Sequence, residues 1–152
     1  MVVSDTTPIT TLLKARQIDL LQKLFGSIII PEAVFEELRA LHAAVPDFIR
    51  VEPIVDHDRR LPGTENLGRG EAEAVRLAKE VGAEILLTDD RKARAAAASL
   101  GIKCAGLLGL LIQAKKTNLT RSVRSMIEVL EDEGGLYLSA DVKAEALKIA
   151  GE

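Results

Sequence analysis

Acidic side chains stand at four places in this 152-residue sequence where a purely structural pattern would not favour them. Asp5 directly follows a short apolar segment, and Asp89 and Asp90 follow another. Glu37 and Glu71 lie inside segments whose apolar residues recur at helical spacing. Several carboxylates in apolar surroundings repel one another and resist the loss of water. They must therefore be protonated, paired with cations or bound to metal.

Helical spacing distinguishes Glu37 from its neighbour Glu36. Both lie in a helix expected over residues 31–43, with one apolar stripe on its buried face. Glu37 shares the face of this stripe, whereas Glu36 turns toward solvent. Glu37 is then either a partner of Arg39 or Arg60 in a partly buried ion pair, or a metal ligand. The stripe consists of Val34, Leu38 and Leu41.

The same reasoning separates Glu71 from Glu73 in a helix expected over residues 70–81. Glu71 falls on the apolar line of that helix, whereas Glu73 falls on the side of Glu80 and should be solvated. The alternative is that Glu71 only favours the positive end of the helix dipole, a role that Glu73 would serve nearly as well. The apolar line consists of Ala74, Ala78 and Val81.

The aspartates are expected where strands end. Ligands bind at the carboxyl edge of parallel sheets, which favours a functional Asp5. Capping of the next helix explains Asp5 equally well. Of Asp89 and Asp90, one should cap the following helix and the other should point toward Asp5, and the spacing does not decide which. The Thr88 hydroxyl could position one of them.

Apolar strands alternate with helices along the sequence, which predicts an α/β fold with a parallel sheet covered on both faces. Strands are expected at residues 1–4, 27–30, 51–55, 84–88 and 102–105. Helices are expected at 8–25 (one or two), 31–43, 70–81, 91–100, 107–116, 120–132 and 139–149. Residues 56–68 should form a surface loop. The length fits one domain over residues 1–152.

Composition excludes several classes of function. Aromatic residues make up only 3% of the chain, which argues against a platform that stacks nucleic-acid bases. Two histidines and the single Cys104 nearly exclude a structural zinc site. A net charge of −3 gives no overall attraction to nucleic acid, so such binding must rest on local basic patches or bound cations. No signal peptide and no apolar run of about 20 residues is present, so we expect a cytoplasmic protein without a membrane span.

The chemistry that fits the carboxylates is metal-assisted hydrolysis. Oxygen ligands without His or Cys select Mg²⁺ or Mn²⁺. Such a site suits phosphodiesters, because the metal activates water and stabilises charge on the phosphate. A phosphatase of the haloacid dehalogenase class needs a second Asp two residues after the first, and Thr7 stands there instead.

The sequence resembles the PIN-domain ribonucleases, including the VapC-like toxins of toxin–antitoxin pairs. The matching segments over residues 1–115 are VVSDTTPIT, IIIPEAVFEEL, GRGEAEAVRLA and ILLTDDRKARAAAASLGIKCAGLLGLLIQA, in the order of the family. The resemblance implies a three-layer α/β/α sandwich with a central parallel sheet and Mg²⁺- or Mn²⁺-dependent cleavage of RNA. Residues 117–152 are less characteristic of the family.

Carried over residue by residue, the resemblance makes the catalytic metal ligands Asp5, Glu37, Glu71 and either Asp89 or Asp90. The expected substrate-binding residues are Thr6, Arg69, Thr88 and Lys92. Further candidate RNA contacts are Arg59, Arg60, Arg94, Lys115 and Lys116. The resemblance also implies a homodimer and a small antitoxin protein that blocks the site. The competing hypothesis is a non-catalytic PIN-like module that acts through a protein partner.

Overall fold

A computed structural model describes residues 1–57 and 61–152 of the protein, and its centre is a parallel sheet. The strands are β1 (Val2–Ser4), β2 (Ile28–Ile30), β3 (Ile49–Val51), β4 (Ile85–Leu87) and β5 (Cys104–Ala105). They lie in the order β3-β2-β1-β4-β5, and each neighbouring pair is parallel. The predicted candidates Arg59 and Arg60 lie outside the described residues.

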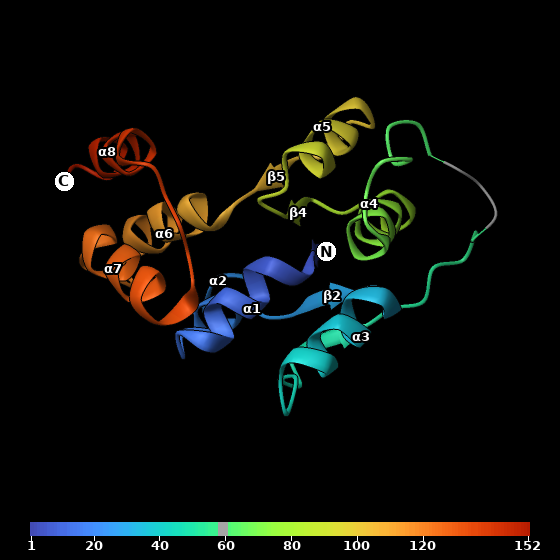
Figure 1. Ribbon diagram of the computed structural model, residues 1–152, viewed down its shortest axis with the longest axis horizontal. Helices are drawn as coiled ribbons and strands as arrows, with labels where there is room; N and C mark the ends of the chain where they lie inside the picture. Colours follow the sequence, from blue (N-terminus) through green and yellow to red (C-terminus); the bar gives the residue numbers. More distant parts are fainter. Residues whose placement is uncertain (58–60) are drawn as a thin grey trace.

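Eight helices of the described chain lie around the sheet (Figure 1). They are α1 (Thr6–Lys14), α2 (Asp19–Phe25), α3 (Glu32–Leu41), α4 (Arg69–Val81), α5 (Arg91–Ser99), α6 (Leu107–Lys116), α7 (Val123–Gly134) and α8 (Ala140–Ile149). The expected α/β/α sandwich with a central parallel sheet is confirmed. None of these helices has the length and apolar character that crossing a membrane requires.

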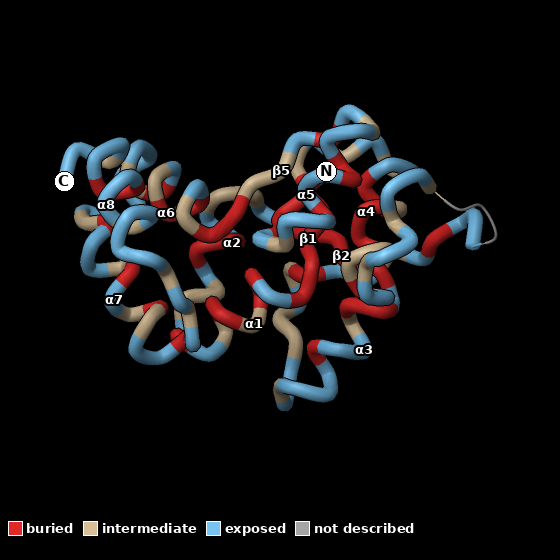
Figure 2. The backbone as a smooth tube through the Cα atoms, turned by 45° about the horizontal axis from the view of Figure 1, so that its top comes forward, coloured by how far each residue is buried: buried red, intermediate tan, exposed pale blue. Residues whose placement is uncertain are grey.

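The inner strands are apolar because both of their faces are covered. Every residue of β1 and β2 is buried, and so are Leu86 and Leu87 of β4. Branched side chains suit such a pleated surface packed on both sides. Figure 2 shows buried backbone running through these strands and the inner turns of the helices.

The strand order reverses between β1 and β4, which is where open α/β sheets have their ligand-binding crevice. Connections from β1 lead outward through β2 to β3, and the chain then returns to the other side of β1 as β4. At such a reversal the helices diverge and leave space outside the carboxyl ends of the two strands, where ligands bind in open α/β sheets. Asp5 follows β1 and Thr88 follows β4, so both residues stand at this point.

Some element boundaries differ from the prediction. The edge strand β3 covers Ile49–Val51 rather than residues 51–55, because Pro53 has no N–H to extend the ladder. Helix α3 ends at Leu41, which is 60% exposed and is therefore not part of a buried stripe. The first helix begins at Thr6, two residues earlier than expected, because Asp5 caps it.

The C-terminal helices α6, α7 and α8 lie together at one end of the molecule (left in Figure 1). Helix α7 packs on α1, and Gly134, the last residue of α7, lies against Thr11 of α1. A Cβ atom at position 134 would lie 2.8 Å from the Thr11 carbonyl oxygen. The absence of a side chain there allows the two helices to approach each other.

We expect Gly134→Ala to destabilise the protein by about 1–3 kcal/mol, because the new methyl group forces α7 away from α1. Gly109→Ala is the matched control. Gly109 lies inside α6, and a Cβ there meets nothing within 4 Å. This change should stabilise the protein by up to about 1 kcal/mol through helix propensity. Urea unfolding of both variants gives the comparison, and equal effects of the same sign would contradict the packing role of Gly134.

Candidate active site

Asp5 lies at the carboxyl end of β1, where the sheet and α1 hold it on several sides. Its N–H donates to the Leu87 carbonyl oxygen at 2.9 Å, which continues the β1–β4 pairing. Its carboxylate accepts the Thr6 N–H at 2.7 Å and the Thr88 hydroxyl at 3.1 Å. Only 5% of Asp5 is exposed. The side chain is therefore both the cap of α1 and a carboxylate fixed at the crevice.

The pKa of Asp5 is raised to about 6. Burial is the main cause, and the negative charges of Glu71 and Glu37 raise it further. The hydrogen bonds from Thr6 and Thr88 oppose the shift only in part. No lysine or arginine of the described chain forms an ion pair with Asp5. Its charge is therefore largely uncompensated by the protein.

Glu37 reaches the same region from α3. Its carboxylate accepts the hydroxyl hydrogen of Thr6, the residue that follows Asp5. It also lies against Gly70 of α4, where a Cβ atom would come within 2.5 Å of Glu37 Oε1. The residue is exposed, so the prediction of a shared buried face overstated its burial. Arg39, a proposed ion-pair partner, lies instead over the Phe35 ring.

Glu71 approaches from the first turn of α4. Its carboxylate accepts the Gly68 N–H at 2.8 Å, which forms a capping arrangement at the start of the helix. Its charge is nevertheless close enough to raise the pKa of Asp5, more than Glu37 does. Both predicted roles of Glu71, as a helix-end carboxylate and as a member of the acidic group, are compatible with its position.

Asp89 and Asp90 each serve a helix N-terminus. Asp90 caps α5, because its carboxylate accepts the Ala93 N–H at 2.8 Å. Asp89 lies at the start of α6 and accepts the Leu107 N–H at 3.2 Å. Burial raises the pKa of Asp89, while Leu107 and the nearby Arg94 act in the opposite direction. Asp90 is linked to Asp5 through the Thr88 hydroxyl, which accepts the Asp90 N–H and donates to Asp5.

The expected substrate-binding residues have different surroundings. Thr88 is fully buried, and its hydroxyl donates to Asp5 and accepts the Asp90 N–H, so it holds the side chain of Asp5 in place. Thr6 is also buried, and its hydroxyl is engaged by Glu37. Lys92 is exposed, and its ammonium takes part in no ion pair within the described chain.

Arg69 is exposed but paired. Its guanidinium contacts Glu36 at 2.7 Å and Glu73 at 3.0 Å, so the expected phosphate contact would have to compete with two carboxylates. The expectation of a solvated Glu73 is wrong, because its side chain is only 18% exposed and also accepts the Ala33 N–H. Helical phase could not reveal the contact with Ala33, which belongs to another helix, whereas Arg69 stands four residues before Glu73 in the same helix.

A second arginine, Arg94, was predicted only as a further RNA contact and not among the main substrate-binding residues. Arg94 of α5 donates to the Thr88 carbonyl oxygen at 3.2 Å and acts on the charge of Asp89. A Cβ atom at position 106 would lie 3.0 Å from Arg94 Nη1 and would also collide with the Asp89 carboxylate. Arg94 and Asp89 therefore enclose Gly106. The position of Arg94 four residues after the capping Asp90 was the only available signal, and that pattern is common in ordinary helices.

The acidic group fits a hard divalent cation in donor chemistry and charge. Asp5, Glu37 and Glu71 supply only oxygen donors, and their mutual repulsion would be relieved by a cation. In the arrangement described, however, no three side chains with carboxylate, imidazole or thiol donors converge on a single ion position among residues 1–57 and 61–152. Glu37 and Glu71 are turned toward Thr6 and Gly68 instead.

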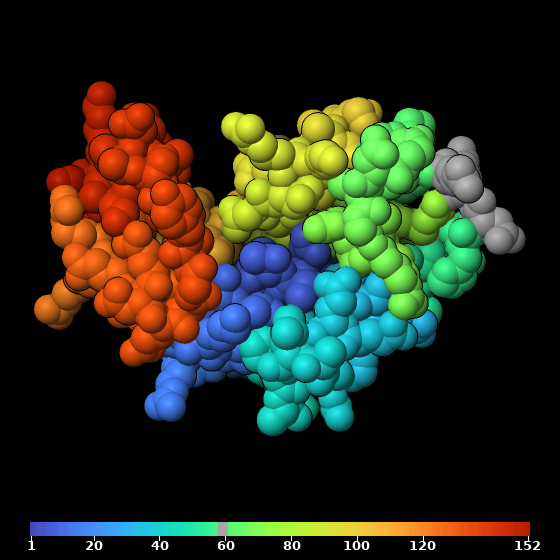
Figure 3. All heavy atoms as spheres, viewed as in Figure 1, coloured from blue at the N-terminus to red at the C-terminus, as the bar shows by residue number. Residues whose placement is uncertain are grey.

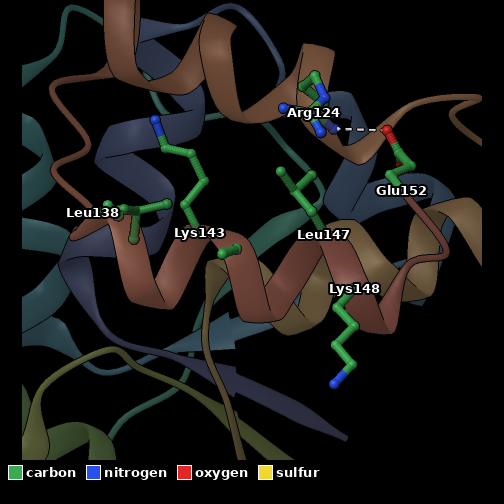
Figure 4. A pocket seen from close by; sticks show the side chains of 8 residues that line it. Arg124, Leu138, Lys143, Leu147, Lys148 and Glu152 are labelled. Carbon is green, nitrogen blue, oxygen red and sulfur yellow. Dashed lines mark hydrogen bonds between the residues drawn. The ribbon is translucent and has the colours of Figure 1, made fainter.

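The surface beside the site is hollowed. Figure 3 shows a depression between α5 (yellow) and the C-terminal helices (orange and red), with the first residues of the chain (blue) at its floor. A separate cavity lies between α7 and α8, with Leu138 and Leu147 among its lining residues (Figure 4). It contains none of the acidic residues described above.

Comparison with known proteins decides the family. A family model that describes a PIN domain (DUF3368) matches residues 1–152. The chain therefore belongs to the PIN-domain family. The fold is similar to a PilT N-terminus domain protein from the hyperthermophilic archaeon Sulfolobus solfataricus P2, with a TM-score of 0.56 and 19% identity over 75% of this chain and 93% of that one. No curated protein matches the sequence significantly. PIN-domain proteins are generally hydrolytic nucleases, which supports a nuclease-type role.

The raised pKa of Asp5 predicts how this PIN-domain protein responds to pH. In the unfolded chain the carboxyl has a pKa of 3.8, and in the folded protein about 6. The folded state therefore binds the proton more tightly, and stability falls as pH rises through this window, by up to about 3 kcal/mol.

We expect Asp5→Asn to be more stable than the wild type at pH 8 by about 1–3 kcal/mol in EDTA, because Asn is neutral and still caps α1. The advantage should disappear below pH 4, where Asp5 is protonated. Thermal unfolding at the two pH values measures both differences. A variant less stable than the wild type at pH 8 would contradict the electrostatic strain at Asp5.

Proposed function

We propose that this PIN-domain protein is a metal-dependent endoribonuclease that hydrolyses RNA phosphodiesters. The observation that carries the proposal is the uncompensated carboxylate of Asp5 at the β1–β4 crevice, with Glu71 and Glu37 nearby. A structural role alone explains an aspartate that caps α1, but it does not explain why two further acids lie close enough to raise its pKa. Accumulated negative charge at a ligand-binding edge is typical of a cation site.

The proposed cofactor is Mg²⁺ or Mn²⁺, held by Asp5, Glu37 and Glu71. When bound, such an ion activates water and stabilises negative charge on the phosphate. Thr88 fixes one oxygen of Asp5, and the Thr6 N–H fixes the other. Glu37 and Glu71 must leave the Thr6 hydroxyl and the Gly68 N–H to converge with Asp5.

The fourth ligand is proposed among Asp89 and Asp90. Asp90 is linked to Asp5 through the Thr88 hydroxyl, while its carboxylate caps α5. Asp89 is held between the α6 N-terminus and Arg94. Because both carboxylates are engaged, Asp5, Glu37 and Glu71 form the core of the proposed site, and the fourth position remains either aspartate.

RNA is the proposed substrate, and the hollow beside α5 is its proposed approach. Lys92, on the first turn of α5, offers a phosphate an ammonium that forms no ion pair with the residues the structure describes. Arg69 would first have to release Glu36 and Glu73. The resemblance to VapC-like toxins supports a cytoplasmic toxin of a toxin–antitoxin pair, with a small antitoxin partner and a homodimeric assembly, as the biological setting.

We expect the purified protein to cleave single-stranded RNA with Mg²⁺ or Mn²⁺ and to lose about 100-fold or more of this rate on Asp5→Asn, because the central proposed ligand loses its charge. Asp132→Asn, on the exposed face of α7, is the matched control and should retain the rate within about twofold. Electrophoresis of a labelled RNA measures the cleavage. Full activity of the Asp5 variant in EDTA would refute the proposal.

A non-catalytic PIN-like module that binds a protein partner is the second candidate. It is favoured by the lack of three converging donor side chains within the described chain. Calorimetry with Mn²⁺ separates the two functions. Binding that is abolished by Asp5→Asn supports the nuclease, and no binding at millimolar Mn²⁺ together with no RNA cleavage supports the module.

A further inference from the structure

Helix α3, which carries Glu37, begins without a cap of its own. The residue before its first turn is Pro31, which has no side-chain acceptor for the first N–H groups of the helix, and these have no partner within the helix. Ala33, in that turn, is only 2% exposed, so water cannot readily satisfy its N–H. The N–H instead donates to Glu73 Oε1 of α4 at 3.3 Å. One helix therefore supplies the cap of another.

Arg69 holds this cap in place. Its Nε atom donates to Glu73 Oε2 at 3.0 Å, on the oxygen that Ala33 does not use. Its Nη1 atom donates to Glu36 Oε2 of α3 at 2.7 Å. The Arg69–Glu36 pair is exposed and contributes little by itself. Together with the Glu73 contacts, it joins the N-terminal halves of α3 and α4 at two points.

This joint lies beside the proposed metal ligands. Helices α3 and α4 pack against each other (Figure 1), and the packing presses Glu37 against Gly70, the residue after Arg69. On its other side Glu37 accepts the Thr6 hydroxyl. A small shift of α3 along α4 would therefore move the Glu37 carboxylate relative to Thr6 and Asp5.

We propose that Glu73 is a positioning residue for the acidic site: by capping α3 from α4 it sets the register that places the Glu37 carboxylate beside Thr6 and Asp5. The inference rests on the proposed function for its catalytic meaning, but the positioning itself is testable without metal. Glu73 touches no substrate or ion in this role and acts only through α3.

The decisive comparison is Glu73→Ala against Glu80→Ala. Glu80 lies on the same helix and likewise accepts backbone N–H groups, from Val55 at 2.9 Å and Asp56 at 3.0 Å. Both variants lose a helix-to-backbone contact, so general destabilisation should be similar. Only the Glu73 variant should alter Glu37.

The metal-free readout is the amide signal of Thr6 in ¹⁵N-labelled protein, because the Thr6 hydroxyl binds Glu37 and Thr6 is remote in sequence from both substitutions. We expect it to shift in Glu73→Ala and to stay in place in Glu80→Ala. An unmoved signal in Glu73→Ala, or equal shifts in the two variants, would overturn the inference.

The second readout is Mn²⁺ affinity by calorimetry, which should fall about tenfold in Glu73→Ala and remain unchanged in Glu80→Ala. Unchanged affinity in Glu73→Ala, with a wild type that binds, would also overturn the inference. If the wild type binds no Mn²⁺, the proposed function fails while the Thr6 signal still decides the positioning role.

Glu73→Gln tests the chemical basis. The amide oxygen can still accept the Ala33 N–H, although the ion pair with Arg69 is lost. We expect this variant to keep the Thr6 signal and to bind Mn²⁺ within about threefold of the wild type. A loss as large as that of Glu73→Ala would overturn the capping role of Glu73.

Discussion

The burial of one carboxylate, Asp5, governs the arrangement of the whole site. Its N–H completes the pairing of β1 with β4, and its side chain caps α1. The reversal of strand order beside β1 makes this the open edge of the sheet. Burial and the charges of Glu71 and Glu37 then raise its pKa to about 6, so the folded protein holds an ionised group there only at a cost in stability. A cation is the ligand that would relieve this cost.

Most carboxylates around the crevice have a second, structural task. Asp5 caps α1, Glu71 caps α4 and Asp90 caps α5, while Asp89 binds the first N–H of α6. Four helices therefore begin next to the crevice, and their positive ends favour negative charge there. Glu37 is different, because it caps nothing and depends on α3 being placed correctly. That dependence gives the contact between Glu73 and α3 its importance.

The site also depends on how closely the helices approach one another. Gly70 lets the Glu37 carboxylate lie against α4, and Gly106 lets Asp89 and Arg94 close around the start of α6. At the far end, Gly134 lets α7 meet α1, the helix that Asp5 begins. Each glycine serves here through its missing side chain, since the neighbouring atoms occupy the space that a Cβ would need.

The sequence by itself determined the parallel α/β fold, because continuous apolar strands alternating with helices have few other ways to bury their surface. Helical phase, a local property, also proposed Glu37 and Glu71 as candidates, but it misjudged the exposure of Glu37 and Glu73. Only the tertiary structure decided how the residues around the site are buried and paired. Thr88 is buried, Arg69 pairs with two carboxylates, and Glu73 caps another helix. Apart from the Arg69–Glu73 pair, which has i,i+4 spacing within α4, those outcomes depend on contacts between elements far apart in the chain, and no periodicity within one helix records them.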